Sequence, residues 1–242
     1  MAVLAMDTAT LATVVAVGTE AGLLVGSAVV VPRAHSRILQ PLFQSALETA
    51  GISPLELERI VVGVGPGSYT GVRLGVATAK AMAAALNVPL TPVPTLHAMA
   101  EAAAPGNRSQ PAVVLSLLSA RRQRAFGTIR RKDGLVWKEL EDKSVRPVAK
   151  WLELLAAHSG QTACIVIHDL SEAEPDFPAP VLATWLQLRA AAPALGPALL
   201  AVGRNAPSLS GLLLHQLTPD YALPVEAEAR LGEGGGNGNA TR

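Results

Sequence analysis

The chain has little cysteine, few aromatic residues and almost no net charge. Cys164 is its single cysteine, which excludes an intramolecular disulfide and a cysteine-rich zinc site. Aromatic residues make up 3% of the 242 residues, so we expect a core of aliphatic side chains. The formal net charge of +1 gives no electrostatic argument for strong nucleic-acid binding by this chain alone. A reducing compartment, the cytoplasm, fits this composition best.

Long hydrophobic runs are also absent. The apolar beginning of the chain carries no positively charged leader and is interrupted by Asp7, so we expect no signal peptide. The apolar stretches 79–90 and 190–202 are broken by proline, glycine or asparagine, well short of the ~20 residues that cross a bilayer. These features predict a soluble protein. Residues 232–242, rich in glycine and asparagine, predict a disordered tail.

The most informative stretch is a glycine-rich loop between an apolar strand-like run and an alanine-rich helical run. It reads Gly65-Pro66-Gly67-Ser68-Tyr69-Thr70-Gly71-Val72-Arg73-Leu74-Gly75. Such a unit places free backbone N–H groups at a helix end, as phosphate sites and close backbone contacts require. It lacks the Gly-Lys-Ser/Thr ending of a P-loop and the glycine spacing of a dinucleotide fingerprint. A serine nucleophile is not expected either, because Ser68 lies outside a Gly-x-Ser-x-Gly elbow.

Hydrophobic periodicity predicts an α/β protein of two tandem half-domains. The first half has the order βββαβαβα, with a helix over 36–50 that Ser36 caps and Gly51 ends. This order is typical of the actin-like ATPase fold (the ASKHA, ribonuclease H-like class). A turn-rich linker at 105–109 precedes a similar but trimmed second half. We therefore predict half-domains at 1–105 and 106–231, with strands of the second at 112–118, 124–130, 135–140 and 163–168, and helices at 148–157, 181–191 and 197–202.

Several motifs together resemble the TsaB (YeaZ) family, the partner subunit of the bacterial machinery that adds threonylcarbamoyl to adenosine in tRNA. They are the glycine loop, Asp7-Thr8-Ala9-Thr10, Arg33-Ala34-His35-Ser36 and Pro94-Thr95-Leu96. The likeness is looser in the second half. There Ser119-Ala120-Arg121 replaces the family's Asp-Ala-Arg, and Tyr221-Ala222-Leu223 replaces its Tyr-Leu-Arg.

The resemblance implies a non-catalytic dimerisation and activating subunit. Its catalytic TsaD-like paralogue would transfer threonylcarbamoyl to adenosine 37 of tRNAs that read codons beginning with adenosine. A TsaE-like ATPase would be a further partner, tRNA would be met through the complex, and the isolated chain would form a homodimer. The chain would hold no cofactor or metal of its own, with ATP or ADP and a metal ion in the partner subunits.

A stripe of small residues recurs every four positions in the helix after the glycine loop, at Gly71, Gly75, Ala79 and Ala83. Another helix can approach such a stripe closely. The stripe could face the chain's own sheet, or it could face a partner. The resemblance implies a partner, bound by this helix and the one after Ser36. The predicted interface comprises Ser36, Leu39, Leu42, Phe43, Gly67, Tyr69, Thr70, Gly71, Arg73, Leu74, Gly75, Thr78, Ala79 and Met82.

Arg73 stands on the first turn of this helix, where the positive end of the helix dipole disfavours a cation. Some group is therefore expected to compensate its charge. We keep two alternatives, an ion pair with a carboxylate of this chain and a contact across the interface or to a phosphate bound there.

Asp7, Thr8 and Thr10 lie where actin-like ATPases place a carboxylate and hydroxyls near a metal and phosphates. The alternative is a strand-end turn in which Asp7 accepts bonds from nearby N–H groups. Because the resemblance implies a non-catalytic relative, we favour the structural role and at most a vestigial phosphate site. A second hypothesis is a small-molecule kinase or ATPase that acts through Asp7 and the cleft between the halves.

Two further features are weighed. His35 lacks a second histidine four residues later, so a metal site there is not expected. The basic residues Arg121, Arg122, Arg124, Arg130, Arg131 and Lys132 could form a phosphate-tracking patch or a charged strand edge. Phe126 is the one aromatic residue among them, so direct RNA reading is not favoured.

Overall fold

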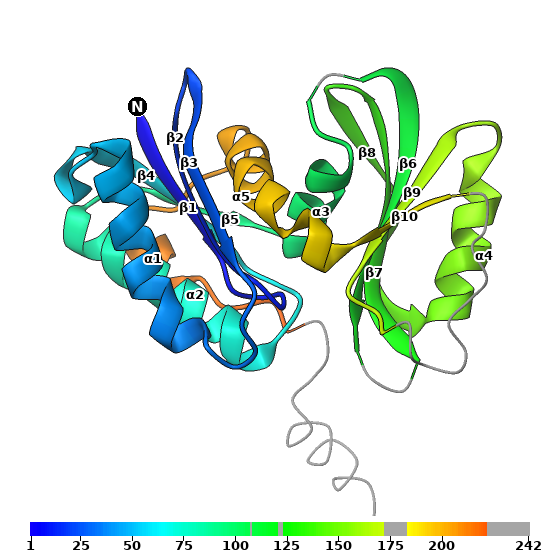
Figure 1. Ribbon diagram of the computed structural model, residues 1–242, viewed down its shortest axis with the longest axis horizontal. Helices are drawn as coiled ribbons and strands as arrows, with labels where there is room; N and C mark the ends of the chain where they lie inside the picture. Colours follow the sequence, from blue (N-terminus) through cyan, green and yellow to red (C-terminus); the bar gives the residue numbers. More distant parts are fainter. Residues whose placement is uncertain (107, 121–122, 172–182, 222–242) are drawn as a thin grey trace, which may run out of the picture.

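The computed structural model describes residues 1–106, 108–120, 123–171 and 183–221. Two five-stranded sheets stand side by side (Figure 1). The first has the order β3-β2-β1-β4-β5 and the second the corresponding order β8-β7-β6-β9-β10. The strands of the first sheet are β1 Ala2–Asp7, β2 Thr13–Thr19, β3 Gly22–Val29, β4 Leu57–Gly63 and β5 Leu90–Val93. Those of the second are β6 Arg108–Ser119, β7 Arg124–Gly134, β8 Val136–Pro147, β9 Ala163–His168 and β10 Thr184–Gln187.

Both sheets combine an antiparallel meander with two parallel strands. In the first, β1 pairs antiparallel with β2 and parallel with β4, and in the second, β6 pairs antiparallel with β7 and parallel with β9. The predicted order of the first half and the tandem architecture are therefore confirmed. The link from β9 to β10 spans residues 169–183 whereas the equivalent link from β4 to β5 spans 64–89, so the second half is shorter there.

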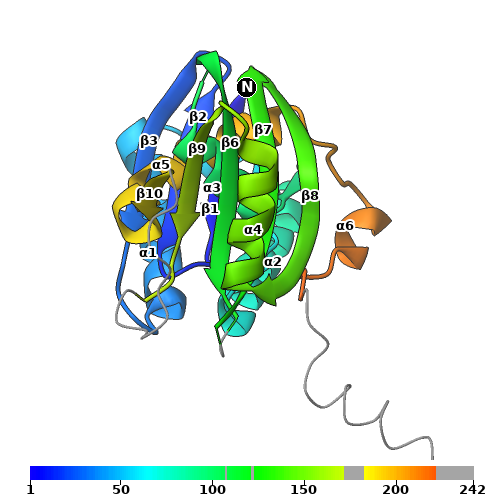
Figure 2. The ribbon, with the colours of Figure 1, turned by 90° about the vertical axis from the view of Figure 1, so that its right-hand side faces the viewer.

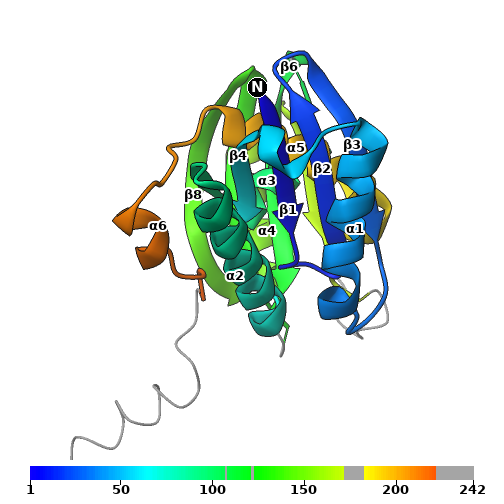
Figure 3. The ribbon, with the colours of Figure 1, turned by 90° about the vertical axis from the view of Figure 1, so that its left-hand side faces the viewer.

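Helices cover both faces of the first sheet. The helices are α1 His35–Ala50, α2 Tyr69–Leu86, α3 Thr95–Ala103, α4 Val148–Ser159, α5 Leu188–Arg204 and α6 Leu212–Gln216, with a short 3₁₀ turn at Pro54–Glu56. Figure 3 shows α1 and α2 together on the outer face of this sheet, and α5 lies on its inner face. Side chains of β1 alternate accordingly, since Leu4 and Met6 face α1 and α2 while Ala5 faces α5. The outer face of the second sheet is covered by α4 (Figure 2).

The two halves exchange helices across their boundary. Helix α3, which follows the first sheet in the chain, packs on the second sheet, while α5, which follows the second sheet, packs on the first. The predicted boundary at residue 105 thus separates the strands but not the helices. Among the residues described, no helix combines the length and apolarity needed to cross a bilayer.

Two local predictions were wrong. Helix α1 begins at His35 after Ala34, so Ser36 lies inside it and caps nothing. Instead of separate helices at 181–191 and 197–202, residues 184–187 form strand β10 and residues 188–204 form one helix. This helix continues through two prolines because an apolar face buried against the first sheet outweighs the lost backbone bonds. The stop of α1 at Gly51, which has a φ of 67°, is confirmed.

A buried ion pair joins α3 to the second sheet. The Nζ of Lys132, 1% exposed, donates to both oxygens of Glu101 at 2.9 and 2.8 Å and to the carbonyl of Ala104 at 2.7 Å. Trp137 Nε1 donates to the same carboxylate at 2.7 Å. Full bonding of both charges offsets the cost of removing them from water.

We predict that Lys132→Ala lowers the free energy of unfolding by about 3–5 kcal/mol, because it leaves the Glu101 carboxylate buried without its cation. Urea unfolding measures the change. Lys138→Ala, at an exposed position on β8, is the matched control and should change stability by less than ~0.5 kcal/mol. A similarly small loss for Lys132→Ala would show that the pair does not hold the halves together.

Candidate partner-binding surface

The end of β1 is closed by its own hydrogen bonds. Asp7 is 1% exposed, its Oδ1 accepts the Ala9 N–H at 2.6 Å, and its Oδ2 accepts the Thr95 hydroxyl at 2.8 Å. Thr95 Oγ1 in turn accepts the Gly65 N–H at 3.1 Å. Burial raises the pKa of Asp7 to about 6, while the bonds from Thr95 and Ala9 act in the opposite direction. The hydroxyl of Thr95 therefore connects the glycine loop to the Asp7 carboxylate and so holds the end of β1 against α3.

Thr8 continues this tie to α2. Its hydroxyl donates to the Gly71 carbonyl at 2.6 Å, and the Ser68 N–H donates to the Ala9 carbonyl at 2.7 Å. Thr10 is also buried, and its Oγ1 accepts the Ala12 N–H at 3.2 Å. The oxygens proposed for a phosphate site thus bond within the chain, as the strand-end turn interpretation expects. This geometry gives no support to a kinase acting through Asp7.

The small-residue stripe of α2 faces the chain's own sheet. A Cβ added at Gly71 would overlap the Thr8 carbonyl oxygen, and one added at Gly75 would lie 2.5 Å from Thr8 Oγ1. Ala79 and Ala83 are buried in the core between α2 and the sheet. The prediction that Gly71, Gly75 and Ala79 receive a partner is corrected, because these positions have no surface to offer. Leu39 of α1 is likewise buried, at 2% exposed.

The remaining predicted interface residues keep accessible surface on the outer side of α1 and α2. Tyr69, Thr70, Arg73 and Ser36 are exposed. The half-buried members are Leu42, Phe43, Gly67, Leu74, Thr78 and Met82. Apart from Gly67 in the glycine loop, these residues belong to α1 and α2, which lie beside each other on the outer face of the first sheet (Figure 3).

Helix α2 also carries a second set of small residues, which are not among the predicted interface positions. Ala77, Ala81, Ala84 and Ala85 are exposed on the side turned away from the sheet. A surface helix normally presents charged and polar side chains there. An outward face of alanines instead allows another helix to approach closely.

Arg73 has a compensating group that neither alternative named. Its guanidinium lies 4.4 Å from the ring centre of Tyr69 and 5.6 Å from that of Tyr221, and its Nε donates to the Tyr221 hydroxyl at 2.7 Å. The two rings are 5.0 Å apart. Tyr221 had been noted only as the first residue of a motif that departs from the family pattern, and Ala222 and Leu223 lie outside the described residues.

The segment 217–221, here called the strap, fixes Tyr221 beside α2. The Asp220 N–H donates to the Val64 carbonyl at 2.8 Å, and the Asp220 carboxylate pairs with Lys143 of β8. Lys80 of α2 donates to the carbonyls of His215 and Leu217 at 2.8 and 2.9 Å. The strap therefore connects α2 with the glycine loop and with the second sheet.

His35 has a local role in the described structure. Its Nδ1 bonds to Thr13 Oγ1 at 2.8 Å, and partial burial lowers its pKa. No cluster of His, Cys, Asp and Glu that could hold a metal ion is present within the described part of the chain. Ser119, the departure from the family's Asp, donates its N–H to Asp169 at 2.6 Å, and burial raises the pKa of Asp169.

Some of the basic residues predicted to form a patch are paired with carboxylates in the structure. Arg130 Nε bonds to Glu139 at 2.9 Å, and Lys132 is buried against Glu101. Arg124 is exposed, with a long contact of 3.5 Å to the Val145 carbonyl, and Arg121 and Arg122 lie outside the described residues. Two cations of β7 are thus neutralised by carboxylates of neighbouring elements, which weakens the argument for a phosphate-tracking surface here.

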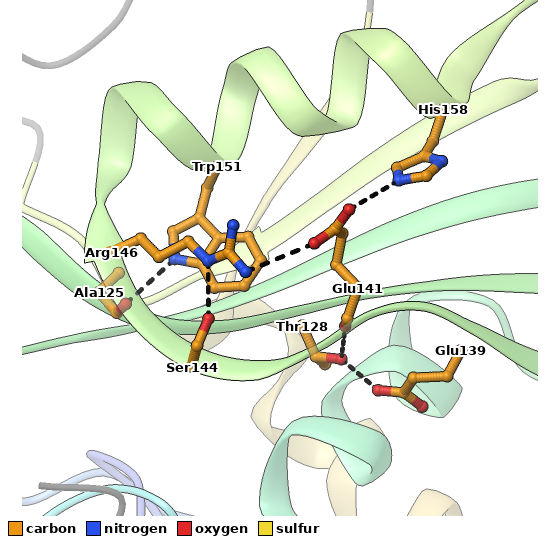
Figure 4. Close-up of polar contacts among 8 residues, drawn as sticks. All are labelled: Ala125, Thr128, Glu139, Glu141, Ser144, Arg146, Trp151 and His158. Atoms are coloured by element: carbon orange, nitrogen blue, oxygen red, sulfur yellow. Dashed lines mark hydrogen bonds and ion pairs between the residues drawn. The ribbon is translucent and has the colours of Figure 1, made fainter.

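Two acidic residues of β8, Glu139 and Glu141, bond to side chains of β7, β8 and α4 (Figure 4). Glu141 contacts His158 of α4 at 3.0 Å and Arg146 at 3.5 Å, while Thr128 donates to Glu139. Arg146 also packs over the ring of Trp151, which donates to the Ala125 carbonyl at 3.1 Å. These contacts dock α4 on the second sheet.

Comparison with known proteins gives matching results for sequence and fold. The sequence model of the family TsaD: tRNA N6-adenosine threonylcarbamoyltransferase matches residues 29–182. The chain is 31% identical over 233 residues to the tRNA threonylcarbamoyladenosine biosynthesis protein TsaB of Bacillus subtilis (strain 168), covering 95% of this chain and 97% of that protein. It is 33% identical over 146 residues to the protein of the same name from Escherichia coli (strain K12), covering 60% of this chain and 62% of that protein.

Two solved structures share the architecture. YeaZ from Pseudomonas aeruginosa superposes with a TM-score of 0.72 at 23% identity, covering 91% of this chain and 99% of that one. An uncharacterized protein with similarity to peptidase YEAZ from Pseudomonas aeruginosa gives 0.71 at 23% identity, covering 92% and 99%. With the strand orders and the family match, these similarities confirm the predicted actin-like fold.

We predict that Asp7 makes stability pH-dependent. Because its folded-state pKa of about 6 exceeds the ordinary aspartate value of 3.8, folding favours the protonated carboxyl. The stabilisation of the folded state that results is complete below about pH 4 and is lost as the pH rises through about 6. Relative to Asp7→Asn, the wild-type free energy of unfolding should fall by about 2 kcal/mol between pH 4 and 7. Urea unfolding across this range tests it, and a difference that stays flat or rises would contradict the burial effect.

We also predict that Gly71→Ala destabilises the isolated chain by about 1–3 kcal/mol, since its methyl group would overlap the Thr8 carbonyl. Alanine in an open helical position would stabilise instead. Thermal and urea unfolding measure the effect. Ala84→Ser, at an exposed position of the same helix, should change stability by less than ~0.5 kcal/mol. A Gly71→Ala variant as stable as wild type would mean that α2 does not pack tightly on β1.

Proposed function

This chain belongs to the TsaB family, and from that premise we propose that it acts in the formation of threonylcarbamoyladenosine on tRNA as a non-catalytic, activating subunit. Its partner in this proposal is a TsaD-like threonylcarbamoyltransferase paralogue. The reaction is transfer of threonylcarbamoyl to adenosine 37 of tRNAs that read codons beginning with adenosine. The chain supplies no acid, base or nucleophile, and its contribution is a packing surface that holds the catalytic subunit in a competent geometry.

The outward alanine face of α2 is the observation that supports this role most strongly. The four exposed alanines on the side opposite the sheet have short, uncharged side chains, so a second helix can approach closely at these positions. Helix α1 runs beside α2 and adds the half-buried Leu42 and Phe43 to the same surface. The partner's helices would pack on α1 and α2 to form a helical bundle. In the absence of the paralogue, a second copy of this chain would use the same surface to form a homodimer.

Further partners and cofactors follow from the same premise. A TsaE-like ATPase and tRNA would join through the assembled complex. ATP or ADP and a metal ion would be held by the partner subunits. The proposed location is the cytoplasm.

A reconstituted reaction tests the proposal. The catalytic paralogue, the enzyme that makes threonylcarbamoyl-adenylate, the ATPase and tRNA are combined with and without this protein, and the modified nucleoside is quantified. Product that depends on this chain, together with no magnesium-dependent ATP binding by the chain alone, is the expected result. Tight ATP binding with no effect on product would favour a kinase or ATPase instead.

We predict that Ala81→Arg abolishes heterodimer formation and lowers the rate of product formation at least tenfold, while the variant folds normally. A long charged side chain there would hold a partner helix away from α2. Size-exclusion chromatography with light scattering reports the complex, and circular dichroism reports folding. Ala149→Arg makes the same change at an exposed position of α4 and should leave both unchanged. Normal pairing by Ala81→Arg would place the interface elsewhere.

A further inference from the structure

A groove runs along the side of α2 that faces the strap. It has a volume of about 440 Å³, and both of its cationic lining residues belong to α2. Its lining consists of Arg73, Val76, Ala77, Lys80, Leu217, Pro219 and Tyr221. None of these residues is acidic, so the groove favours a ligand that combines an apolar part with negative charge.

The guanidinium of Arg73 is held in place without being neutralised. Stacking against Tyr69 and Tyr221 and the bond from Nε to the Tyr221 hydroxyl fix its plane. Within the described ranges, no carboxylate lies within ion-pair distance of Arg73, and neither of its Nη atoms forms a hydrogen bond. A fixed guanidinium whose Nη atoms have no partner among the described residues matches the two oxygens of a carboxylate.

The opposite wall of the groove is fixed as well. Lys80 binds the Leu217 carbonyl at the start of the strap and the His215 carbonyl of α6. Near the end of the strap, the Asp220 N–H bonds to the Val64 carbonyl and the Asp220 carboxylate pairs with Lys143. Because both walls are already ordered, a ligand loses little free energy in shaping the site. Ala77 belongs both to the groove and to the outward alanine face of α2, so the two surfaces are continuous.

We propose that this groove receives a segment of the catalytic paralogue in which an acidic side chain stands beside an apolar one. The carboxylate pairs with Arg73, and the apolar side chain packs on Val76, Leu217 and Pro219. The strap thereby makes the second half of the chain a determinant of partner choice, since it positions Tyr221 and through it Arg73. This inference rests on the proposed function and names the contact that gives it specificity.

The test is the Kd of the purified full-length chain for the catalytic paralogue, measured by isothermal titration calorimetry at about 50 and 200 mM NaCl. Wild type should bind more weakly at the higher salt concentration. Arg73→Ala should raise the Kd at least tenfold and lose most of the salt dependence, because Arg73 acts as an anchoring residue. Arg73→Lys keeps the charge but loses the planar fork and should recover only part of the affinity.

Two further variants test the contribution of Tyr221 and control for the loss of positive charge. Tyr221→Phe removes the acceptor of the Arg73 Nε bond but keeps the ring, and should raise the Kd about threefold. Arg204→Ala removes an exposed arginine at the end of α5 and is the matched control. Its Kd should equal that of wild type. Thermal unfolding of each variant verifies that the fold is intact.

Three outcomes would overturn the inference. If Arg73→Ala binds like wild type while Ala81→Arg does not bind, the helical interface stands and the groove has no part in it. If removal of residues 222–242 tightens binding and makes Arg73→Ala neutral, the chain's own C-terminal residues are the occupant. If wild type does not bind the paralogue at all, the proposed function fails together with this inference.

Discussion

The contact between α2 and the end of β1 is the constraint on which the rest of the structure depends. Thr8 occupies the space where side chains at positions 71 and 75 would lie, so both positions are glycine. The same contact uses the oxygens of Asp7 and Thr8 for bonds within the chain. The end of β1 therefore holds the glycine loop and α2 in place. As a result, the alanine face of α2 points toward solvent.

The second half of the chain supports this arrangement from two directions. The exchanged helices α3 and α5 and the Glu101–Lys132 pair hold the sheets together. At the other side of the molecule, Asp220 pairs with Lys143 of β8 while Tyr221 orients Arg73 of α2. The second sheet therefore has a structural part in shaping the surface of the first half, although our proposal assigns it no chemistry.

The sequence predicted the fold because its period-2 and four-residue patterns are strong and its glycine loop is specific. It could not predict which way the small residues of α2 point, since a four-residue stripe packs equally well on a sheet or on another helix. Tyr221 lies 148 positions from Arg73, so only the folded chain reveals their contact. The ion pairs of Lys132 and Arg130 could not be predicted, because their partners Glu101 and Glu139 stand on other elements. Helix α5 passes through two prolines because burial of one face decides its course.

Hydrogen–deuterium exchange of the whole chain tests the central claim most directly, that the outer face of α1 and α2 binds the catalytic paralogue while the end of β1 is sealed. Addition of the paralogue should slow exchange in residues 35–50, 69–86 and 217–221 and leave α4 unchanged. Addition of magnesium and ATP to the chain alone should change nothing at residues 7–10. Protection of residues 7–10 by the nucleotide, or protection by the paralogue confined to α4 and β8, would contradict the account.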